Sequence, residues 1–146
     1  EAKQVAEDVD FLVIHIYPLW NGKTLDTAIE WMDSTFKDIL SNYPDRQCVL
    51  GETGWATEYN ADKKGPGEQG TLIKGEISMA AQEKYLVMHN KWVNQNRITT
   101  FLFEAFDEPW KGGGDNSAQN EIEKHWGVFY ENRIPKESFI NYLKNK

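Results

Sequence analysis

Three apolar runs alternate with amphipathic patterns along the chain. Residues 11–17 (FLVIHIY) form a short, nearly continuous apolar run with β-branched side chains, and the runs 47–51 (QCVLG) and 99–106 (TTFLFEAF) are similar. Runs of this length and composition predict buried β-strands. Between them, apolar residues recur every three or four positions, first at 25, 29, 32, 36 and 39 and then at 77, 81, 85, 88 and 92. This spacing predicts two amphipathic helices.

The remaining segments complete an alternating order. Pro44 ends the first of these helices, because the residue before a proline is pushed out of the helical region. Pro135 can open a last helix, with Phe139, Ile140 and Leu143 facing inward. Residues 1–9 are typical of the tail of a preceding helix, and 111–121 of a polar, glycine-rich loop. Such alternation predicts parallel strands joined by helical crossovers.

Three strands are few for a parallel sheet, whose faces need cover and whose edges need protection. A complete barrel of parallel strands takes roughly 250 residues, and this chain has 146. We therefore expect residues 1–146 to form a single domain that is a piece of a larger α/β architecture. The alternative is a small sheet that is stable by itself or pairs with a second copy.

Composition excludes some classes of protein. The net charge is −7, which argues against nucleic acid or an anionic membrane surface as a partner. No apolar run approaches the ~20 residues that span a bilayer. The single cysteine, Cys48, excludes an internal disulfide, and its apolar neighbours predict that it is packed.

Polar and aromatic residues gather where each predicted strand ends. The first strand runs into Tyr17 and Trp20, the second into Glu52 and Trp55, and the third into residues 106–111 (FDEPWK). In parallel α/β folds, ligands bind at the carboxyl ends of the strands. Tryptophan rings stack on the apolar faces of sugars, and carboxylates supply the groups that cleave glycosidic bonds. The pattern therefore indicates a carbohydrate site.

Four motifs resemble a known family. Residues 10–18 (DFLVIHIYP), 51–55 (GETGW), 103–111 (FEAFDEPWK) and 123–127 (EKHWG) are similar, in order and spacing, to the later motifs of family 17 glycoside hydrolases. Those are (β/α)8-barrel β-1,3-glucanases, with relatives that cleave mixed-linkage glucan or transfer glucan chains. The resemblance implies a partial TIM barrel, made of strands six to eight with their helices.

The resemblance also implies residue roles. Glu52 would be the nucleophile of an endo-acting, retaining enzyme, and Tyr17 would lie beside it and hydrogen-bond to it. A charged cluster near the reacting sugar would comprise Glu108, Lys111 and Glu123. The floor that binds the sugars would comprise Trp20, Trp55, Phe106, Trp110 and Trp126. The chemistry needs no cofactor and no metal, and the family implies secretion or the cell envelope.

One departure from the family limits the expected activity. The family's general acid/base is a glutamate after an asparagine at the end of the fourth strand, and this chain has no such motif in an early position. Strands one to five would be missing, so the chain alone should have little or no activity. Its partners would be β-glucan and either the missing N-terminal half of the barrel or a second copy. Glu108 or Glu123 as a substitute acid is a minor alternative, and a non-catalytic β-glucan-binding module is another.

For several other residues, a structural role explains their position more simply than a functional one. Asp107 and Glu108 are candidates for a helix-capping pair, since acidic residues favour helix N-termini. Glu104 alternates with apolar residues, faces either the helices or the barrel interior, and is assigned no role. We expect His15, within the first strand, to be a hydrogen-bonded interior residue rather than a metal ligand. His89 and Trp92 are expected to pack on the second helix or to lie at its surface.

Overall fold

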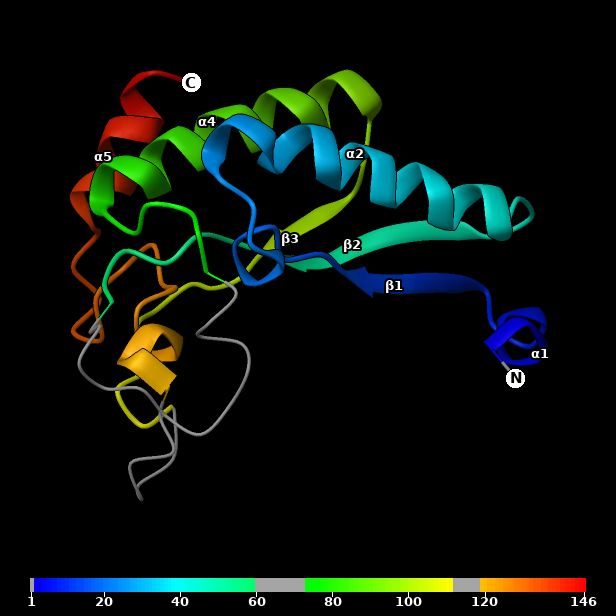
Figure 1. Ribbon diagram of the computed structural model, residues 1–146, viewed down its shortest axis with the longest axis horizontal. Coiled ribbons are helices and arrows are strands. Elements are labelled where there is room, and N and C mark those ends of the chain that lie inside the picture. The colour runs from blue at the N-terminus through cyan, green and yellow to red at the C-terminus, as the bar shows by residue number, and fades with distance from the viewer. Residues whose placement is uncertain (1, 60–72, 112–118) are drawn as a thin grey trace.

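The computed structural model describes residues 2–59, 73–111 and 119–146 and shows helices alternating with parallel strands (Figure 1). The elements in chain order are α1 (Ala2–Glu7), β1 (Phe11–His15), η1 (Leu19–Asn21), α2 (Leu25–Asn42), β2 (Gln47–Thr53), α4 (Met79–Asn96), β3 (Thr100–Leu102), η2 (Gln119–Lys124) and α5 (Glu137–Lys144). The predicted strands and helices are all present. The predicted loops partly fall on 60–72 and 112–118, outside the described residues.

The three strands form one parallel sheet in the order β1-β2-β3, which confirms the predicted topology. β3 is shorter than the predicted strand 99–106. The Phe103 N–H still donates to Thr53 O of β2, but after Phe103 the backbone changes its hydrogen-bonding partner. The Glu104 N–H donates to Trp126 O, and the Asp107 N–H donates to Phe129 O. The chain therefore leaves the sheet and pairs with the segment that follows η2.

Local signals set the ends of the two long helices. α2 ends at Asn42, just before Tyr43 and Pro44, as the proline predicts. At the start of α4, the Ser78 side chain accepts a hydrogen bond from the Ala81 N–H and so satisfies one of the unpaired donors of the first turn. Arg97 closes α4 in a left-handed conformation.

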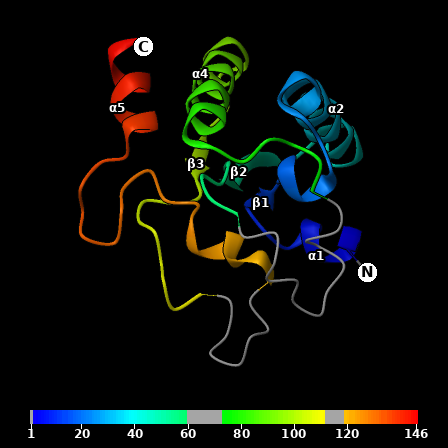
Figure 2. The same cartoon turned by 60° about the vertical axis from the view of Figure 1, so that its left-hand side comes forward.

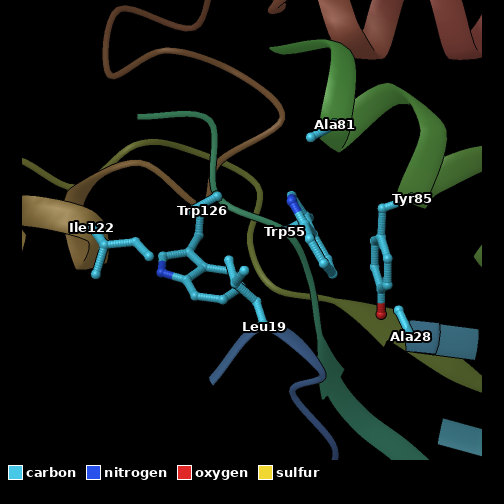
Figure 3. Close-up of a cluster of buried hydrophobic side chains, with 8 residues drawn as sticks. Leu19, Ala28, Trp55, Ala81, Tyr85, Ile122 and Trp126 are labelled. Carbon is cyan, nitrogen blue, oxygen red and sulfur yellow. The ribbon is translucent and has the colours of Figure 1, made fainter. Parts of the chain in front are cut away.

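α2 and α4 cover one face of the sheet (Figures 1 and 2). Between the sheet and α2 and α4 lies a core that includes Met32, Phe36, Cys48, Leu50 and Trp92, all at most 9% exposed. The prediction that Cys48 is packed is confirmed. A second buried cluster, which includes Leu19, Trp55, Tyr85 and Trp126, lies at the carboxyl ends of the strands and supports the loops there (Figure 3).

The opposite face of the sheet is open. Phe11 is 51% exposed, Val13 53% and Phe101 60%. The expectation that the strands are buried on both faces is therefore wrong for this chain. The physical reason is that its long helices all lie on one side, so alternate side chains of the strands face solvent.

α5 buries only part of the predicted face, since Phe139 is half-buried and packs against Phe129 and Tyr142. Ile140 and Leu143, expected to face inward, are 37% and 54% exposed, while Ser138 and Tyr142 are buried. The helix packs beside α4, where the Ser138 hydroxyl donates to the Gln82 side chain. Within the described residues, no helix combines the length and hydropathy needed to cross a membrane.

Candidate active site

A β-bulge in β2 determines where Glu52 points. Ile14 pairs with Leu50, but the next residue of β1, His15, pairs with Glu52, so Gly51 is an extra residue. The pairing with β3 shows the same extra residue, since Leu50 pairs with Thr100 and Thr53 with Leu102. A bulge of this kind re-aims the side chains that follow it. It allows Thr53 to remain buried under the helices while Glu52, one position earlier, faces the open side of the sheet.

Two side chains from the end of β1 contact the Glu52 carboxylate. The Tyr17 hydroxyl donates to Glu52 Oε2 at 2.6 Å, as the sequence predicts. His15 Nδ1 lies 3.1 Å from the same oxygen. Burial, and then the hydrogen bond to Glu52, raise the pKa of the Tyr17 phenol, which therefore stays protonated and remains a donor.

Glycine at position 51 makes room for the His15 contact. A Cβ atom there would clash with Val13 and would lie 3.2 Å from His15 Nε2 and 3.3 Å from Cδ2. The imidazole therefore lies over the glycine, opposite Glu52. The expectation that His15 is an interior residue is wrong, because its side chain is 50% exposed on the open face.

Aromatic rings pack around the ring of Tyr17. The Tyr17 ring meets the rings of Phe103 and Trp126 edge-on, with centroids 5.7 and 5.3 Å apart. The Trp20 ring lies 5.8 Å from that of Trp126. These contacts fix the Tyr17 ring and hence the direction of its hydroxyl toward the carboxylate.

A charged cluster lies on the loops after β3. The Lys111 ammonium lies 2.6 Å from Glu104 Oε2 and 2.7 Å from Glu108 Oε2. Burial by itself would lower the pKa of Lys111, but the bonds to both carboxylates outweigh it and raise that pKa, so Lys111 stays cationic. Burial raises the pKa of Glu123, against the opposing field of Lys111. Glu108, Lys111 and Glu123 therefore lie near one another, as expected. Glu104 is a fourth member of this charged cluster.

The predicted sugar-binding floor is only partly accessible. Trp55 and Trp126 are each 1% exposed, so neither offers a free ring face to a sugar in this structure (Figure 3). Trp55 instead packs against Tyr85 in the core, and its indole donates to Glu76 O. These two assignments are therefore corrected. Both rings lie in the buried cluster beneath the loops, where a large apolar ring gains more from packing than from exposure.

The other predicted floor residues have different surroundings. Phe106 is 41% exposed and packs against Phe129, with ring centroids 5.6 Å apart. Trp110 is 71% exposed, next to Lys111. Trp20 is half-buried beside Trp126. Sugar stacking on these three rings stays a prediction.

Asp107 belongs to a buried cluster and does not cap a helix. The ammonium of Lys136, which is 0% exposed, lies 2.7 Å from Asp107 Oδ1 and 2.7 Å from Thr57 Oγ1. The same Asp107 oxygen accepts the Gly127 N–H at 3.0 Å. No described helix begins at 107 or 108, so the capping hypothesis is wrong. The cluster ties together the loops after β2 and β3 and the start of α5.

Sequence reasoning missed two residues of the site, His15 and Glu104. Both lie in apolar runs, where a polar residue is usually a packed one. The available signal was their position two residues before Tyr17 and Phe106 on strands that end at the site. Of the two alternatives left open for His89 and Trp92, packing is correct, because both are buried. The described residues hold no group of three His, Cys, Asp or Glu side chains able to bind a metal.

Comparison with known proteins identifies a family and several relatives. The BtgE/BtgC glycoside hydrolase domain matches residues 1–127. The glucan 1,3-beta-glucosidase of Arthroderma benhamiae is 31% identical in an alignment 142 residues long, which covers 88% of this chain and 41% of the relative. A putative glucan endo-1,3-beta-glucosidase, btgC, of Aspergillus niger is 29% identical over 86% of this chain and 19% of its own length.

Solved structures agree with the sequence relatives. The family 17 β-1,3-glucanosyltransferase of Rhizomucor miehei superposes with a TM-score of 0.75 at 27% identity, over 92% of this chain and 44% of that structure. An active-site mutant of that enzyme, in complex with laminaritriose, gives a TM-score of 0.73 at 27% identity and the same coverage. The chain thus spans less than half the length of these relatives, and its parallel α/β arrangement is consistent with part of a barrel. The chain belongs to the BtgE/BtgC glycoside hydrolase family, and its resemblance to family 17 glycoside hydrolases is confirmed.

Proposed function

We propose that this chain carries the nucleophile of a retaining, endo-acting glycoside hydrolase for β-1,3-glucan, and that the nucleophile is Glu52. The observation that carries the proposal is the Glu52 carboxylate at the carboxyl end of a parallel sheet, held at Oε2 by Tyr17 at 2.6 Å and by His15 at 3.1 Å. Its side chain is 35% exposed, on the open face. A carboxylate that is oriented and yet reachable is what nucleophilic attack requires.

The chemistry follows from that geometry. Both neighbours contact Oε2, so we propose that Oε1 attacks the anomeric carbon. A bond forms between Oε1 and that carbon while the glycosidic C–O bond breaks, and the leaving oxygen takes a proton from a second carboxyl group. The second carboxyl group, now ionised, then takes a proton from a water molecule, whose oxygen attacks the same carbon and displaces Glu52, and this restores the original anomeric configuration. Tyr17 stabilises the carboxylate that this second step releases.

The second carboxyl group has to lie about 5–5.5 Å from the nucleophile in a retaining enzyme. Among the described carboxylates of the cluster, Glu104 and Glu108 are both bonded to Lys111. Lys111 occupies one oxygen of each, and the other oxygen of Glu104 is buried, so the geometry argues against either as the group that protonates a leaving oxygen. We therefore propose that the acid/base comes from the part of the barrel that precedes these strands, with β1, β2 and β3 as strands six, seven and eight. The chain alone would then be inactive or nearly so.

The substrate class is proposed from the named relatives. Two are glucan 1,3-beta-glucosidases or their endo-acting counterparts, and a structural neighbour was solved with laminaritriose. The largely exposed Trp110, next to Lys111, supports the same class, because a free indole face suits stacking on a sugar.

The open sheet face supports completion by further strands. Phe11, Val13 and Phe101 each expose about half of their surface on that face (51%, 53% and 60%). β1 and β3 also each have one edge without a strand partner in the described sheet. Exposed apolar faces and unpaired strand edges favour association. We propose that the remaining strands of the barrel cover this face, rather than a second copy of the chain.

Complementation tests the proposal. The chain is co-expressed with a segment covering strands one to five of a relative, and hydrolysis of β-1,3-glucan is measured. Glu52→Gln should lower turnover on the order of 10³-fold or more, whereas Glu58→Gln, at an exposed position, should leave it unchanged. An active complex whose turnover survives Glu52→Gln refutes the nucleophile assignment. A complex that binds glucan oligosaccharides, seen by tryptophan fluorescence, but never cleaves them indicates a non-catalytic binding module instead.

A further inference from the structure

The Lys111 ammonium is shared between two carboxylates in a partly buried place. Glu104 Oε2 lies 2.6 Å and Glu108 Oε2 2.7 Å from Nζ, and the ammonium lies 4.1 Å from the centroid of the Phe103 ring. The side chains of Glu104, Lys111 and Glu108 are 13%, 24% and 28% exposed. One cation therefore faces two carboxylates. With both ionised, this group of three residues has a net negative charge, which water screens only in part.

Glu104 has one oxygen without a partner. Its Oε1 is buried and accepts no hydrogen bond from the described residues, while Oε2 is bonded to Lys111. A buried, unpaired anionic oxygen is costly, and a proton on that carboxyl removes the charge. Burial raises the pKa of Glu104 to about 7; Lys111 opposes this shift and Glu108 adds to it.

Charged groups from several elements face Glu104. Lys111 and Glu108 belong to the loop after β3. Tyr17, after β1, feels the charges of Glu104 and of Glu123 on η2. Lys136, before α5, also feels the Glu104 charge. A change in the protonation of Glu104 would therefore be felt at Tyr17, the donor to the proposed nucleophile.

We propose that Glu104 is a positioning residue of this site, which holds the Lys111 ammonium against Glu108 and takes up the exchangeable proton of the cluster. The inference rests on the proposed function only for its significance, because the contacts themselves do not depend on which reaction occurs. The proton comes from solvent and binds the carboxyl oxygen that Lys111 does not occupy. When it binds, the charge of the three-residue group changes from −1 to 0 and Lys111 is held chiefly by Glu108.

A titration of the 146-residue chain tests this inference without any substrate. The carboxyl carbon of Glu104 and the ε-carbon protons of Lys111 are followed by NMR from pH 4 to pH 9 in protein labelled on glutamate and lysine. Both signals should change with a shared midpoint near pH 7. Glu104→Gln should abolish this step in the Lys111 signal. Glu123→Gln, the matched control, removes a carboxylate that influences Lys111 without bonding to it and should preserve the step.

The outcomes are decisive in either direction. A Glu104 carboxyl that titrates near pH 4.5, the ordinary glutamate range, overturns the inference, and so does a Lys111 step that persists in Glu104→Gln. The wild-type titration suffices by itself if the variant does not fold, which an amide spectrum reveals. Loss of the nucleophile assignment in the complementation assay would not alter these signals, so failure of this inference and failure of the proposed function are distinguishable.

Discussion

Replacing Lys136 with methionine should cost the chain a large share of its stability. The Lys136 side chain is completely buried, and its ammonium donates to Asp107 Oδ1 and Thr57 Oγ1, each at 2.7 Å. Methionine keeps most of the volume but removes the charge, both of these hydrogen bonds and a longer one to His125 O at 3.5 Å. The Asp107 carboxylate, whose side chain is 10% exposed, would then keep the Gly127 N–H and the His125 Nδ1 that lies 3.6 Å from Oδ2, but would lose its lysine partner.

The magnitude follows from that burial. Removing one partner of a buried ion pair costs ~3–5 kcal/mol, because the other charge stays buried and unpaired. Domains are stable by only ~5–15 kcal/mol, so Lys136→Met should bring the chain close to unfolding. Urea unfolding followed by tryptophan fluorescence measures the free energy of unfolding. Lys84→Met, at an exposed position on α4, is the matched control and should change it by no more than ~0.5 kcal/mol.

A double-mutant cycle separates the pair from general damage. Asp107→Asn keeps an acceptor for the Gly127 N–H but removes the charge. The double variant should therefore be more stable than the sum of the two single losses predicts. A loss below ~1 kcal/mol for Lys136→Met, or single losses that simply add, would refute the reasoning.

Three further predictions follow from single contacts. Gly54→Ala should lower stability by ~1–3 kcal/mol in urea unfolding, since its Cβ would clash with the Phe103 carbonyl; an unchanged midpoint would contradict this. Tyr17→Phe should lower kcat/KM of the completed barrel ~10–100-fold, because a hydrogen bond to a charged group is lost, and equal rates would show that the bond is dispensable. Burial lowers the pKa of His89 to about 4, so the unfolded chain binds the extra proton between pH 6.5 and 4 and stability should fall as pH falls through that range. An imidazole signal that titrates near pH 6.5 in the folded chain would contradict the third.

Much of the site's location was predictable from the sequence because it depends on local signals. The strand periods, the proline after α2 and the motifs at the strand ends place Tyr17, Glu52 and residues 106–111 at one edge of a parallel sheet, and the structure brings Tyr17 and Glu52 into contact. A strand's carboxyl end is a property of a few consecutive residues. Any parallel arrangement collects such ends on one side.

Accessibility was not predictable, and the tryptophans show why. Trp20, Trp55 and Trp110 follow the ends of predicted strands, yet Trp55 is buried and Trp110 is 71% exposed. Whether a ring lies in the core or in solvent depends on which distant segments pack on it. The indole of Trp55 is covered by Tyr85 and the backbone of Glu76, which lie 30 and 21 residues further along the chain. α5 follows the same rule, since its contact with α4 selects Ser138 and Tyr142 as the buried face.

The sequence by itself determined the order of elements, the parallel topology, the family and the identity of the proposed nucleophile. Only the tertiary structure decided that a bulge at Gly51 turns Glu52 to the open face, that His15 lies opposite it, and that Glu104 shares Lys111 with Glu108. The physical reason is that periodicity fixes which side of an element a residue occupies only while the strand register stays regular. One extra residue reverses that side, and the cross-strand pairing that reveals it joins residues 37 positions apart.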